Sequence, residues 1–397
     1  MEVKPGYKQT EAGVIPDEWE VKNLGAFVTY TNGKAHENNI TDSGRFVVVN
    51  SKFISTEGDI RKYSNHCFCP TSKGDVLMVM SDVPNGRAIA KCYLVERDET
   101  YTVNQRICIL SPQTINAKLL FYKLDRNPYY LAFDDGAKQT NLRKDDVLTC
   151  PLGIPKSDDE QRAIAGTLSD VDALLGALDE LIAKKRDLKQ ATMQQLLTGQ
   201  TRLPGFHGEW DETTFGNIIR HHAGNSTLIK GKLRSTESAG LYPAYSASGQ
   251  DVWCEHYEHE GEAIVVSAVG SRCGKAFVAS GKWCAIANTH VVWPNVDRVN
   301  RRFLGFYIND ENFWLKSGSG QPFVLFKQTF ARPLRLPRVA EQTAIAEVLT
   351  DLDAELAALE QRRAKTRALK QGMMQELLTG RTRLVANVVT RTEETKV

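Results

Sequence analysis

Residues 160–203 read EQRAIAGTLSDVDALLGALDELIAKKRDLKQATMQQLLTGQTRL, and residues 341–384 read EQTAIAEVLTDLDAELAALEQRRAKTRALKQGMMQELLTGRTRL. The two stretches share 27 identities over 44 ungapped positions, at a constant offset of 181 residues. Neither helix propensity nor composition produces that degree of identity. The chain therefore contains an internal duplication.

Each copy of the repeat predicts one long helix. Apolar residues recur at alternating spacings of four and three, which is typical of a narrow seam that packs against another helix. The seam comprises Ile164, Leu168, Val171, Leu175, Leu178 and Ile182 in the first copy, and Ile345, Leu349, Leu352, Leu356 and Leu359 in the second. Proline precedes each copy, at 155 and 337, and glycine follows the apolar seam near its end, at 199 and 380, as expected at helix boundaries. About 38 helical residues make a rod of roughly 57 Å, which is longer than one domain core requires.

The order along the chain is globular segment, helix, globular segment, helix. If the two seams pair, the helices run antiparallel, and the two halves are related by a pseudo-twofold axis. We therefore expect an α+β fold with two mixed α/β domains, separated and joined by two long antiparallel coiled-coil helices. The expected segments are a first globular domain at 1–155, a helix at 156–203, a second globular domain at 204–337, a helix at 338–384 and a disordered tail at 385–397. Arg363 stands where Ile182 continues the first seam, so the symmetry should be least exact there.

The globular segments differ in sequence but share landmarks. Each opens near a tryptophan, at 19 and 210, and each has a Gly-acidic strand start followed later by a strand after asparagine. The expected strands are 74–81 and 104–110 in the first segment, and 261–268 and 288–294 in the second. Short helices are expected at 117–126 and 300–316. At an offset of 182 the closing loops 136–155 and 318–337 also align, so the duplication extends to the globular segments.

Composition restricts the class of protein. The chain has 397 residues, 42% hydrophobic and 25% charged, as in ordinary globular proteins of two or three domains. It has no run of 18 apolar residues, so we expect no membrane span, and its polar start does not resemble a secretory signal. Eight cysteines without paired knuckles suggest reduced thiols in a cytoplasm. The net charge of +2 supports nucleic-acid binding only weakly, because a local basic patch matters more than the total.

The whole chain resembles the specificity subunits of type I restriction–modification systems. The resemblance rests on the alternation of diverged domains with nearly identical helices and on three motifs. These are GYKQTEAGVIPDEWEVKNLG at 6–25, the paired EQ-x-AIA helix starts, and the paired LLTG-x-TRL helix ends. Unlike globular halves independently indicate unlike half-sites, and a stiff spacer indicates a fixed gap between them.

The resemblance implies a specific division of labour. Each globular domain would act as a target-recognition domain that reads one half of a split, asymmetric sequence in double-stranded DNA. The helices would set the gap and dock two modification subunits, which carry the adenine methyltransferase chemistry and bind S-adenosylmethionine. Two translocating, cleaving restriction subunits can join such a complex. The chain itself would bind no cofactor and would not be an enzyme.

The closing loop of each globular segment supplies the candidate DNA contacts. Glutamine and asparagine can pair with adenine, and arginine with guanine, while glycine lets a backbone approach a ligand closely. The candidates are Lys138, Gln139, Asn141, Arg143 and Lys144 in the first segment, and Ser319, Gln321 and Lys327 in the second. Further candidates beside glycine-containing turns are Asn32, Lys34, Arg87, Arg272 and Lys275. The competing interpretation is that these are solvated turn residues, and for the second group plain surface charge is favoured.

The sequence does not favour catalysis or a metal site. Neither Cys254-x-His256-x-x-His259 nor Cys67-x-Cys69 is accompanied by a second ligand cluster at structural-zinc spacing. His221 and His222 are interpreted as loop or surface residues. No adenine-methyltransferase motif, P-loop or nuclease carboxylate cluster is present, which disfavours a self-contained nuclease or methyltransferase. The alternative that stays open is a two-headed coiled-coil adaptor that binds two proteins and no nucleic acid.

Overall fold

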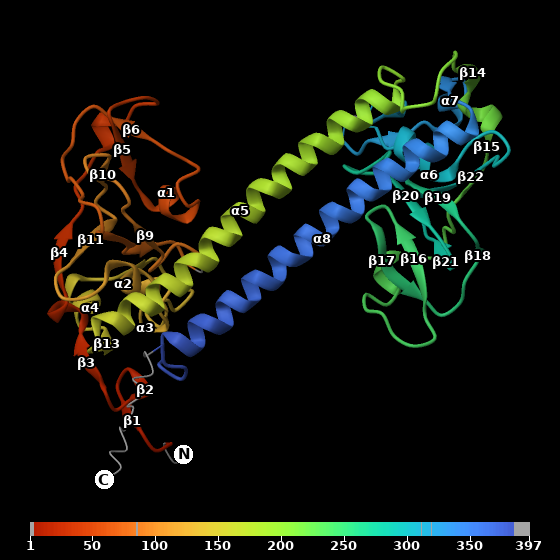
Figure 1. Ribbon diagram of the computed structural model, residues 1–397. Helices are drawn as coiled ribbons and strands as arrows, with labels where there is room; N and C mark the ends of the chain where they lie inside the picture. The colour runs from red at the N-terminus through yellow and green to blue at the C-terminus, as the bar shows by residue number, and fades with distance from the viewer. Residues whose placement is uncertain (1–3, 85, 311, 319, 385–397) are drawn as a thin grey trace, which may run out of the picture. The chain divides into compact units, whose positions relative to one another are not determined.

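The computed structural model describes residues 4–84, 86–310, 312–318 and 320–384 (Figure 1). The chain divides into two compact units, each described here by itself. Unit 1 contains the residues up to Leu178 together with those from Arg362 onward, and unit 2 contains Asp179–Gln361. The tail predicted for 385–397 lies outside the described residues.

The globular part of unit 1 is built on a four-stranded antiparallel sheet in the order β4-β11-β7-β9. These strands are β4 (Val28–Asn32), β11 (Ile107–Pro112), β7 (Val76–Val79) and β9 (Cys92–Leu94). A second sheet has the order β10-β5-β6. The remaining strands are β1 (Tyr7–Thr10), β2 (Gly13–Pro16), β3 (Trp19–Asn23), β5 (Phe46–Val49), β6 (Tyr63–Ser64), β8 (Ser81–Asp82), β10 (Tyr101–Val103), β12 (Thr140–Asn141) and β13 (Pro151–Pro155). The short helices are α1 (Ser51–Ser55), α2 (Ala117–Leu124), α3 (Pro128–Leu131) and α4 (Lys144–Leu148).

Unit 2 repeats the central sheet in the order β15-β22-β19-β20. These strands are β15 (Ile219–Ala223), β22 (Thr289–Pro294), β19 (Ala263–Ser267) and β20 (Ala276–Ala279). A second sheet has the order β17-β16-β21-β18, from β17 (Gly249–Cys254), β16 (Tyr242–Ser246), β21 (Lys282–Ala285) and β18 (His259–Glu260). The remaining elements are β14 (Asp211–Thr214), β23 (Lys316–Ser317), β24 (Phe323–Val324), β25 (Pro333–Leu336), α6 (Arg301–Ile308) and α7 (Phe326–Thr329).

The central strand of each sheet is buried on both faces. In β7, Val76 and Met78 belong to the cluster that includes Leu120 of α2, while Leu77 and Val79 face the second sheet of the unit. This follows from the alternation of side chains along a strand, and it explains why the sequence VLMV is apolar throughout. Strand β19 shows the same alternation between two clusters in unit 2.

The repeated stretches form the helices α5 (Asp158–Leu197) and α8 (Val339–Leu377), as the apolar spacing predicts. Both helices end at the expected glycines, with φ of 73° at Gly199 and 71° at Gly380. A side chain at these positions would also crowd the opening tryptophan segment, tightly at Gly199 and with a collision at Gly380. A Cβ on Gly199 would lie 3.1 Å from the Trp210 ring, and one on Gly380 would lie 2.6 Å from Pro16. The LLTG motif therefore needs glycine for both its backbone angle and its close packing.

The helices run antiparallel within each unit. In unit 1 the start of α5 lies beside the end of α8 (Figure 1), and Lys370 forms an ion pair with Asp172 at 2.6 Å. In unit 2 the end of α5 lies beside the start of α8, and Lys185 pairs with Glu355 at 2.7 Å. Arg186 and Lys189 pair with Glu360 and Asp353 in the same half. This arrangement agrees with the predicted antiparallel coiled coil.

All the predicted seam residues are buried or half-buried. Their partners, however, include more than the other helix. Ile164 and Leu168 share a cluster with Leu119 of α2 and Leu377 of α8, and in unit 2 Ile345 shares a cluster with α6 and the end of α5. The first turns of each repeat therefore bind the globular part of the unit to the helix pair.

The expected helix at 300–316 is shorter than the sequence indicates. Helix α6 ends at Ile308, and the Asn309 side chain accepts a hydrogen bond from the backbone of Ala276 at 3.1 Å. Phe313 and Trp314 then turn back into the core of unit 2. The apolar content that suggested a longer helix belongs to this returning segment.

Candidate nucleic-acid interface

A polar concave site of about 330 Å³ lies in unit 1 where several chain segments meet. It is lined by Asn32, Met80, Ser81, Gln105, Arg106, Gln139, Asn141 and Leu142. Three of these were predicted, namely Asn32, Gln139 and Asn141. The other polar members come from β8 and from the turn before β11, which no local sequence pattern marks as neighbours of the closing loop.

Backbone hydrogen bonds hold these segments together. The Leu142 amide donates to the Met80 carbonyl at 2.8 Å, and the Met80 amide donates to the Arg106 carbonyl at 2.9 Å. The end of β4 approaches the turn so closely that a Cβ on Gly33 would lie 2.0 Å from the Asn104 carbonyl oxygen. The site is thus built on paired backbone rather than on a free loop, which fixes its side chains relative to the sheet.

Side-chain hydrogen bonds connect the polar groups of the site. Gln139 Nε2 donates to Ser81 Oγ at 2.8 Å and to Asn141 Oδ1 at 3.1 Å, and Ser81 Oγ donates to the same Asn141 oxygen at 2.7 Å. Tyr30 donates its hydroxyl to Asn32 Oδ1 at 2.7 Å. Within the described part of the chain, the Arg106 guanidinium forms no ion pair. The site therefore presents amides and one cation to solvent.

The other candidates of unit 1 lie outside this concave site. Lys144 is connected to the site through Tyr30. Its Nζ lies 5.6 Å from the centre of the Tyr30 ring, and the Tyr30 hydroxyl donates to Asn32. Lys138 and Arg143 are exposed within the closing loop, and Lys34 and Arg87 are exposed on other segments. These cations can contact DNA phosphates, but they are not gathered into the polar cluster.

Unit 2 has the same backbone arrangement at the position that corresponds to the concave site of unit 1, but with different side chains. The Val324 amide donates to the Ala268 carbonyl at 2.9 Å, and the Ala268 amide donates to the Asn288 carbonyl at 2.8 Å, as in unit 1. Gly224 takes the place of Gly33, since its Cβ would lie 2.3 Å from the Ile286 carbonyl oxygen.

The side chains at this place can be matched through these backbone bonds. At an offset of 182, Gln321 corresponds to Gln139, while Asn288 replaces Arg106. Phe323 replaces Asn141, and it pairs with Val269 as Asn141 pairs with Ser81. One glutamine is kept and its surroundings differ.

The remaining unit 2 candidates are dispersed. Gln321 and Arg272 are exposed, Lys275 is half-buried, and Lys327 is exposed on α7. Ser319 lies outside the described residues.

A second concave site in unit 2, of about 370 Å³, lies at the edge strand β15. Arg220, His221, His222 and Trp293 line it. Trp293 Nε1 donates to His222 Nε2 at 3.4 Å. Both histidines belong to β15, so the interpretation of them as loop residues is wrong, while His222 is exposed as a surface residue would be. His221 is half-buried and stacks on Phe326 with ring centres 4.8 Å apart.

Burial lowers the pKa of three histidines in this region. Burial lowers the pKa of His290 to about 4, and the neighbouring His221 and His222 contribute in the same direction. Burial also lowers the pKa of His221 and His259. The sequence reasoning missed Arg220 and Trp293, whose proximity depends on the pairing of β15 with β22.

Each repeat joins its two ends to the other repeat through a buried ion pair. Arg383, in the second LLTG-x-TRL motif, binds Glu160 at the start of the first helix with contacts of 2.5 and 2.9 Å. Arg202, in the first motif, binds Glu341 at the start of the second helix with two contacts of 2.5 Å. Both carboxylate groups belong to residues that are only 2% exposed.

The glutamine that follows each glutamate has an equally specific role. Gln161 Nε2 donates to the Pro155 carbonyl at 2.9 Å, and its Oε1 accepts from the amide of Asn116, the N-cap of α2, at 2.9 Å. Gln342 makes the same two bonds at 2.8 Å, to Pro337 and to the amide of the α6 N-cap residue. The repeated Glu-Gln pair thus orients the globular part against the helices.

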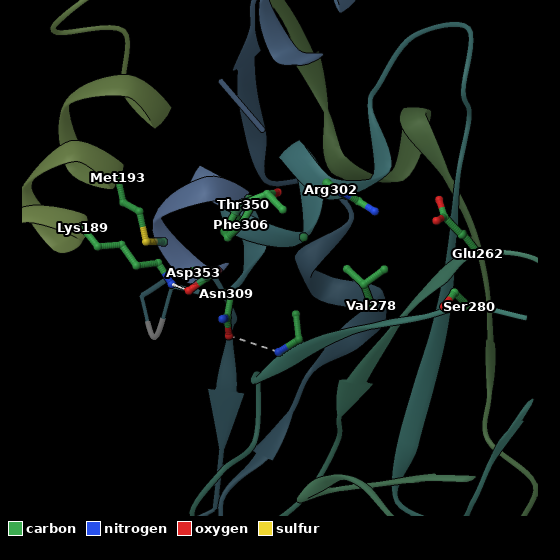
Figure 2. Close-up of a pocket in the computed structure, with 12 residues that line it drawn as sticks. Lys189, Met193, Glu262, Val278, Ser280, Arg302, Phe306, Asn309, Thr350 and Asp353 are labelled. Carbon is green, nitrogen blue, oxygen red and sulfur yellow. Dashed lines mark hydrogen bonds and ion pairs between the residues drawn. The ribbon is translucent and has the colours of Figure 1, made fainter. Parts of the chain in front are cut away.

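A third repeated contact borders a pocket in unit 2 (Figure 2). Lys189 pairs with Asp353 beside the Phe306 ring, as Lys370 pairs with Asp172 beside Tyr122 in unit 1. The pocket has a volume of about 440 Å³ and is also lined by Met193, Val278, Arg302 and Gly305. Aligning the two N-caps places Gly305 where unit 1 has Phe121, so a small residue opens this space.

Two further properties follow from the described residues. No group of three or more His, Cys, Asp or Glu side chains among them could hold a metal ion. No helix in the described part of the chain is both long and apolar enough to cross a membrane.

The sequence comparisons now decide the family. The sequence profile of the type I restriction modification DNA specificity domain matches residues 16–185 and again 208–367. The chain belongs to this family. It is the DNA-specificity subunit of a type I restriction–modification system, a non-catalytic component whose partners are DNA and a methyltransferase. The repeated match also agrees with the internal duplication.

Individual relatives agree with this assignment. The chain is 23% identical to the type I restriction enzyme MjaX specificity subunit of Methanocaldococcus jannaschii, over 95% of this chain and 97% of that protein. It is 30% identical to a type I restriction enzyme specificity subunit of Haemophilus influenzae, over 32% of this chain and 33% of that one. The crystal structure of the S subunit from M. genitalium has the same fold, with a TM-score of 0.64 at 16% identity over 95% of this chain and 98% of that chain.

Proposed function

We propose that each unit of this specificity subunit reads one half of a two-part, asymmetric DNA target. The proposal rests on one observation. The backbone hydrogen bonds that build the concave site of unit 1 are repeated in unit 2, whereas the side chains at the matching positions differ. Arg106 and Asn141 in unit 1 stand where unit 2 has Asn288 and Phe323. A duplicated scaffold with diverged side chains is what reading two different half-sites requires.

Sequencing-based mapping of methylated DNA tests this assignment. The specificity subunit is co-expressed with its methyltransferase as wild type, Gln139→Ala and Gln321→Ala. We expect Gln139→Ala to relax or alter one half-site and Gln321→Ala to alter only the other. If both variants altered the same half-site, or neither altered any, Gln139 and Gln321 would not mark the two reading sites.

We also propose that α5 and α8 set the number of base pairs between the half-sites. The support is that each helix continues without a break from one unit into the other, over 40 and 39 residues. Four residues inserted after Leu178 and four after Gln361 would add about 6 Å to both helices while keeping the contacts inside each unit. The recognised gap should lengthen and both half-sites should stay the same.

An insertion into α5 alone between Lys184 and Lys189 provides the control. It moves Lys189 out of register with Asp353, so we expect reduced stability rather than a cleanly longer gap. A changed half-site with an unchanged gap after the paired insertion would contradict the spacer role.

We further propose, from the internal duplication, which subunits the complex contains. Two equivalent helix ends fit two methyltransferase subunits, which would bind S-adenosylmethionine, and two restriction subunits can join them in the cytoplasm. The pocket beside Lys189 and Gly305 is one place on unit 2 where a partner side chain could insert. The mass of the purified complex, measured by light scattering, tests the ratio of two methyltransferase subunits to one specificity subunit.

The adaptor alternative is not favoured by the family assignment, and a direct binding test separates it. We expect the complex to shift DNA in a gel, with an affinity that falls as salt concentration rises, because phosphate contacts release counterions. An adaptor without nucleic-acid binding would leave DNA unshifted at every salt concentration.

A further inference from the structure

The polar cluster of unit 1 has chemistry specific enough to name the base that it reads. We propose that Gln139 and Asn141 together recognise one adenine of the unit 1 half-site through the major-groove edge of the base. The inference rests on the proposed function and goes beyond it, because it assigns a base and the two atoms that contact it.

The argument starts from the hydrogen-bonding groups that the cluster leaves unused. Both Nε2 hydrogens of Gln139 are used, one by Ser81 Oγ and one by Asn141 Oδ1, and within the described residues its Oε1 remains free to accept. Asn141 Oδ1 already accepts from Gln139 and Ser81, whereas among the same residues its Nδ2 makes only one long contact of 3.4 Å, to the Gln139 carbonyl. The cluster therefore presents one acceptor and one donor side by side.

This pair of groups complements adenine. The major-groove edge of adenine offers the N6 amino group as a donor and N7 as an acceptor. Gln139 Oε1 can accept from N6, and Asn141 Nδ2 can donate to N7. Guanine presents two acceptors on the same edge, so its O6 would face the Gln139 oxygen without a hydrogen between them. Thymine presents an oxygen and a methyl group, and cytosine offers a donor without the N7 acceptor.

The choice of adenine does not depend on which way the two amides are turned, whereas the orientation decides whether Asn141 or Gln139 donates to N7. If both amides were reversed, Gln139 Oε1 would accept from Asn141 Nδ2, and the free groups would be Gln139 Nε2 and Asn141 Oδ1. These are again one donor and one acceptor, with the roles exchanged. Reversing only one amide would place donor against donor or acceptor against acceptor. The network with Ser81 therefore holds the complement to adenine in place before DNA arrives, which reduces the cost of ordering side chains on binding.

Unit 2 supplies the contrast. Phe323 and Val269 stand at the places of Asn141 and Ser81, so Gln321 has neither of these polar neighbours. Gln321 therefore lacks the hydrogen bonds that hold the Gln139 amide in place, although its own amide still carries one donor and one acceptor. The inference is therefore confined to unit 1, and unit 2 provides matched controls.

Base analogues test the two contacts one atom at a time. The target is first mapped with the wild-type complex, and duplexes are then made with 7-deazaadenine, which lacks N7, at each adenine of the unit 1 half-site in turn. Binding of the complete complex is measured at fixed salt. Binding is used instead of methylation because a change at the methylated adenine would stop methylation for a separate reason. We expect one position at which the analogue weakens binding by about five- to tenfold.

Two variants link that position to the proposed atoms. Asn141→Asp keeps the acceptor for Ser81 and Gln139 but removes the donor, so it should bind the natural and analogue duplexes with a ratio near one at this position. Asn141→Ala should give the same ratio. Gln321→Ala, which leaves unit 1 untouched, should keep the wild-type sensitivity. Thermal unfolding of each variant checks that this exposed position leaves the fold intact.

The outcomes separate the inference from the proposed function. If the Asn141 variants and Gln139→Ala all retained full sensitivity to 7-deazaadenine at every adenine, or if the unit 1 half-site contained no adenine, the inference would fail. The proposed function would survive that result provided that Gln139→Ala still altered a half-site. If Gln139→Ala left both half-sites unchanged, the reading role of the whole concave site would fail with it.

Discussion

The guanidinium of Arg383 binds both carboxylate oxygens of Glu160, with Nε to Oε1 at 2.5 Å and Nη2 to Oε2 at 2.9 Å. The two residues belong to different copies of the repeat, and Arg202 binds Glu341 in the same way in unit 2. Each copy thus supplies an acid at its first turn and an arginine after its last turn. These pairs fix which helix start lies beside which helix end.

Removal of Arg383 should destabilise unit 1. Arg383→Ala leaves the nearly inaccessible Glu160 carboxylate without its cation, and breaking a buried pair in this way costs about 3–5 kcal/mol. Guanidinium denaturation, followed by circular dichroism, measures the loss. Arg335→Ala is the matched control, because its pair with Glu212 is exposed on both sides and should contribute less than about 1 kcal/mol. Equal losses for both variants would show that the buried pair has no special role.

Acid should weaken unit 2 through the half-buried His290. Burial lowers the pKa of His290 to about 4, below its ordinary value of 6.5, so the unfolded chain binds this proton first. Stability is therefore fully present above pH 6.5 and falls as the pH drops from 6.5 to 4. His290→Phe should reduce that fall by on the order of 1–2 kcal/mol, since the ring is only partly buried and solvent screens the effect. Substitution of the exposed His207 by Phe controls for the change of residue type.

Two glycines should respond in opposite directions to the same change. Gly305 lies inside α6, where a Cβ would make an ordinary contact of 3.4 Å with Val278, so Gly305→Ala should stabilise by about 0.5–1 kcal/mol. Gly33→Ala would place its Cβ 2.0 Å from the Asn104 carbonyl oxygen and should destabilise by several kcal/mol, on the order of 3. The difference in melting temperature between the two variants measures both effects. A destabilised Gly305→Ala would mean that the pocket beside it is needed for folding.

The sequence predicts the helices well because their information is local. Apolar spacing and proline mark the starts of α5 and α8 to within two residues, whereas the expected ends at 203 and 384 lie six and seven residues beyond the observed ones. Glu160 and Arg383 both stand in the repeated motifs. Their pairing, however, could be predicted only by someone who knew that the start of α5 lies beside the end of α8. The pattern identified the motifs, and only the fold shows which motif binds which.

The candidate site shows the same limit. Gln139 and Asn141 were predicted because they follow a glycine-containing loop, whereas Ser81 and Arg106 come from other strands and become neighbours through β8–β12 pairing and backbone contacts. Single residues of these types occur at many turns, so residue type alone does not distinguish them. Lys34 and Arg87 also stand beside glycine-containing turns, yet they do not line the concave site of unit 1.

Transplanting the unit 1 cluster into unit 2 makes the most demanding prediction. Val269→Ser combined with Phe323→Asn would give Gln321 the two neighbours that Gln139 has, on a backbone that already pairs in the same way. We expect the unit 2 half-site to gain a preference for adenine at one position while the unit 1 half-site stays as in the wild type, and methylation mapping reads both at once. Each single variant supplies only part of the network and should not produce the new preference. If the double variant folded and methylated DNA but kept the original unit 2 half-site, the side chains at this place would not determine the base that is read.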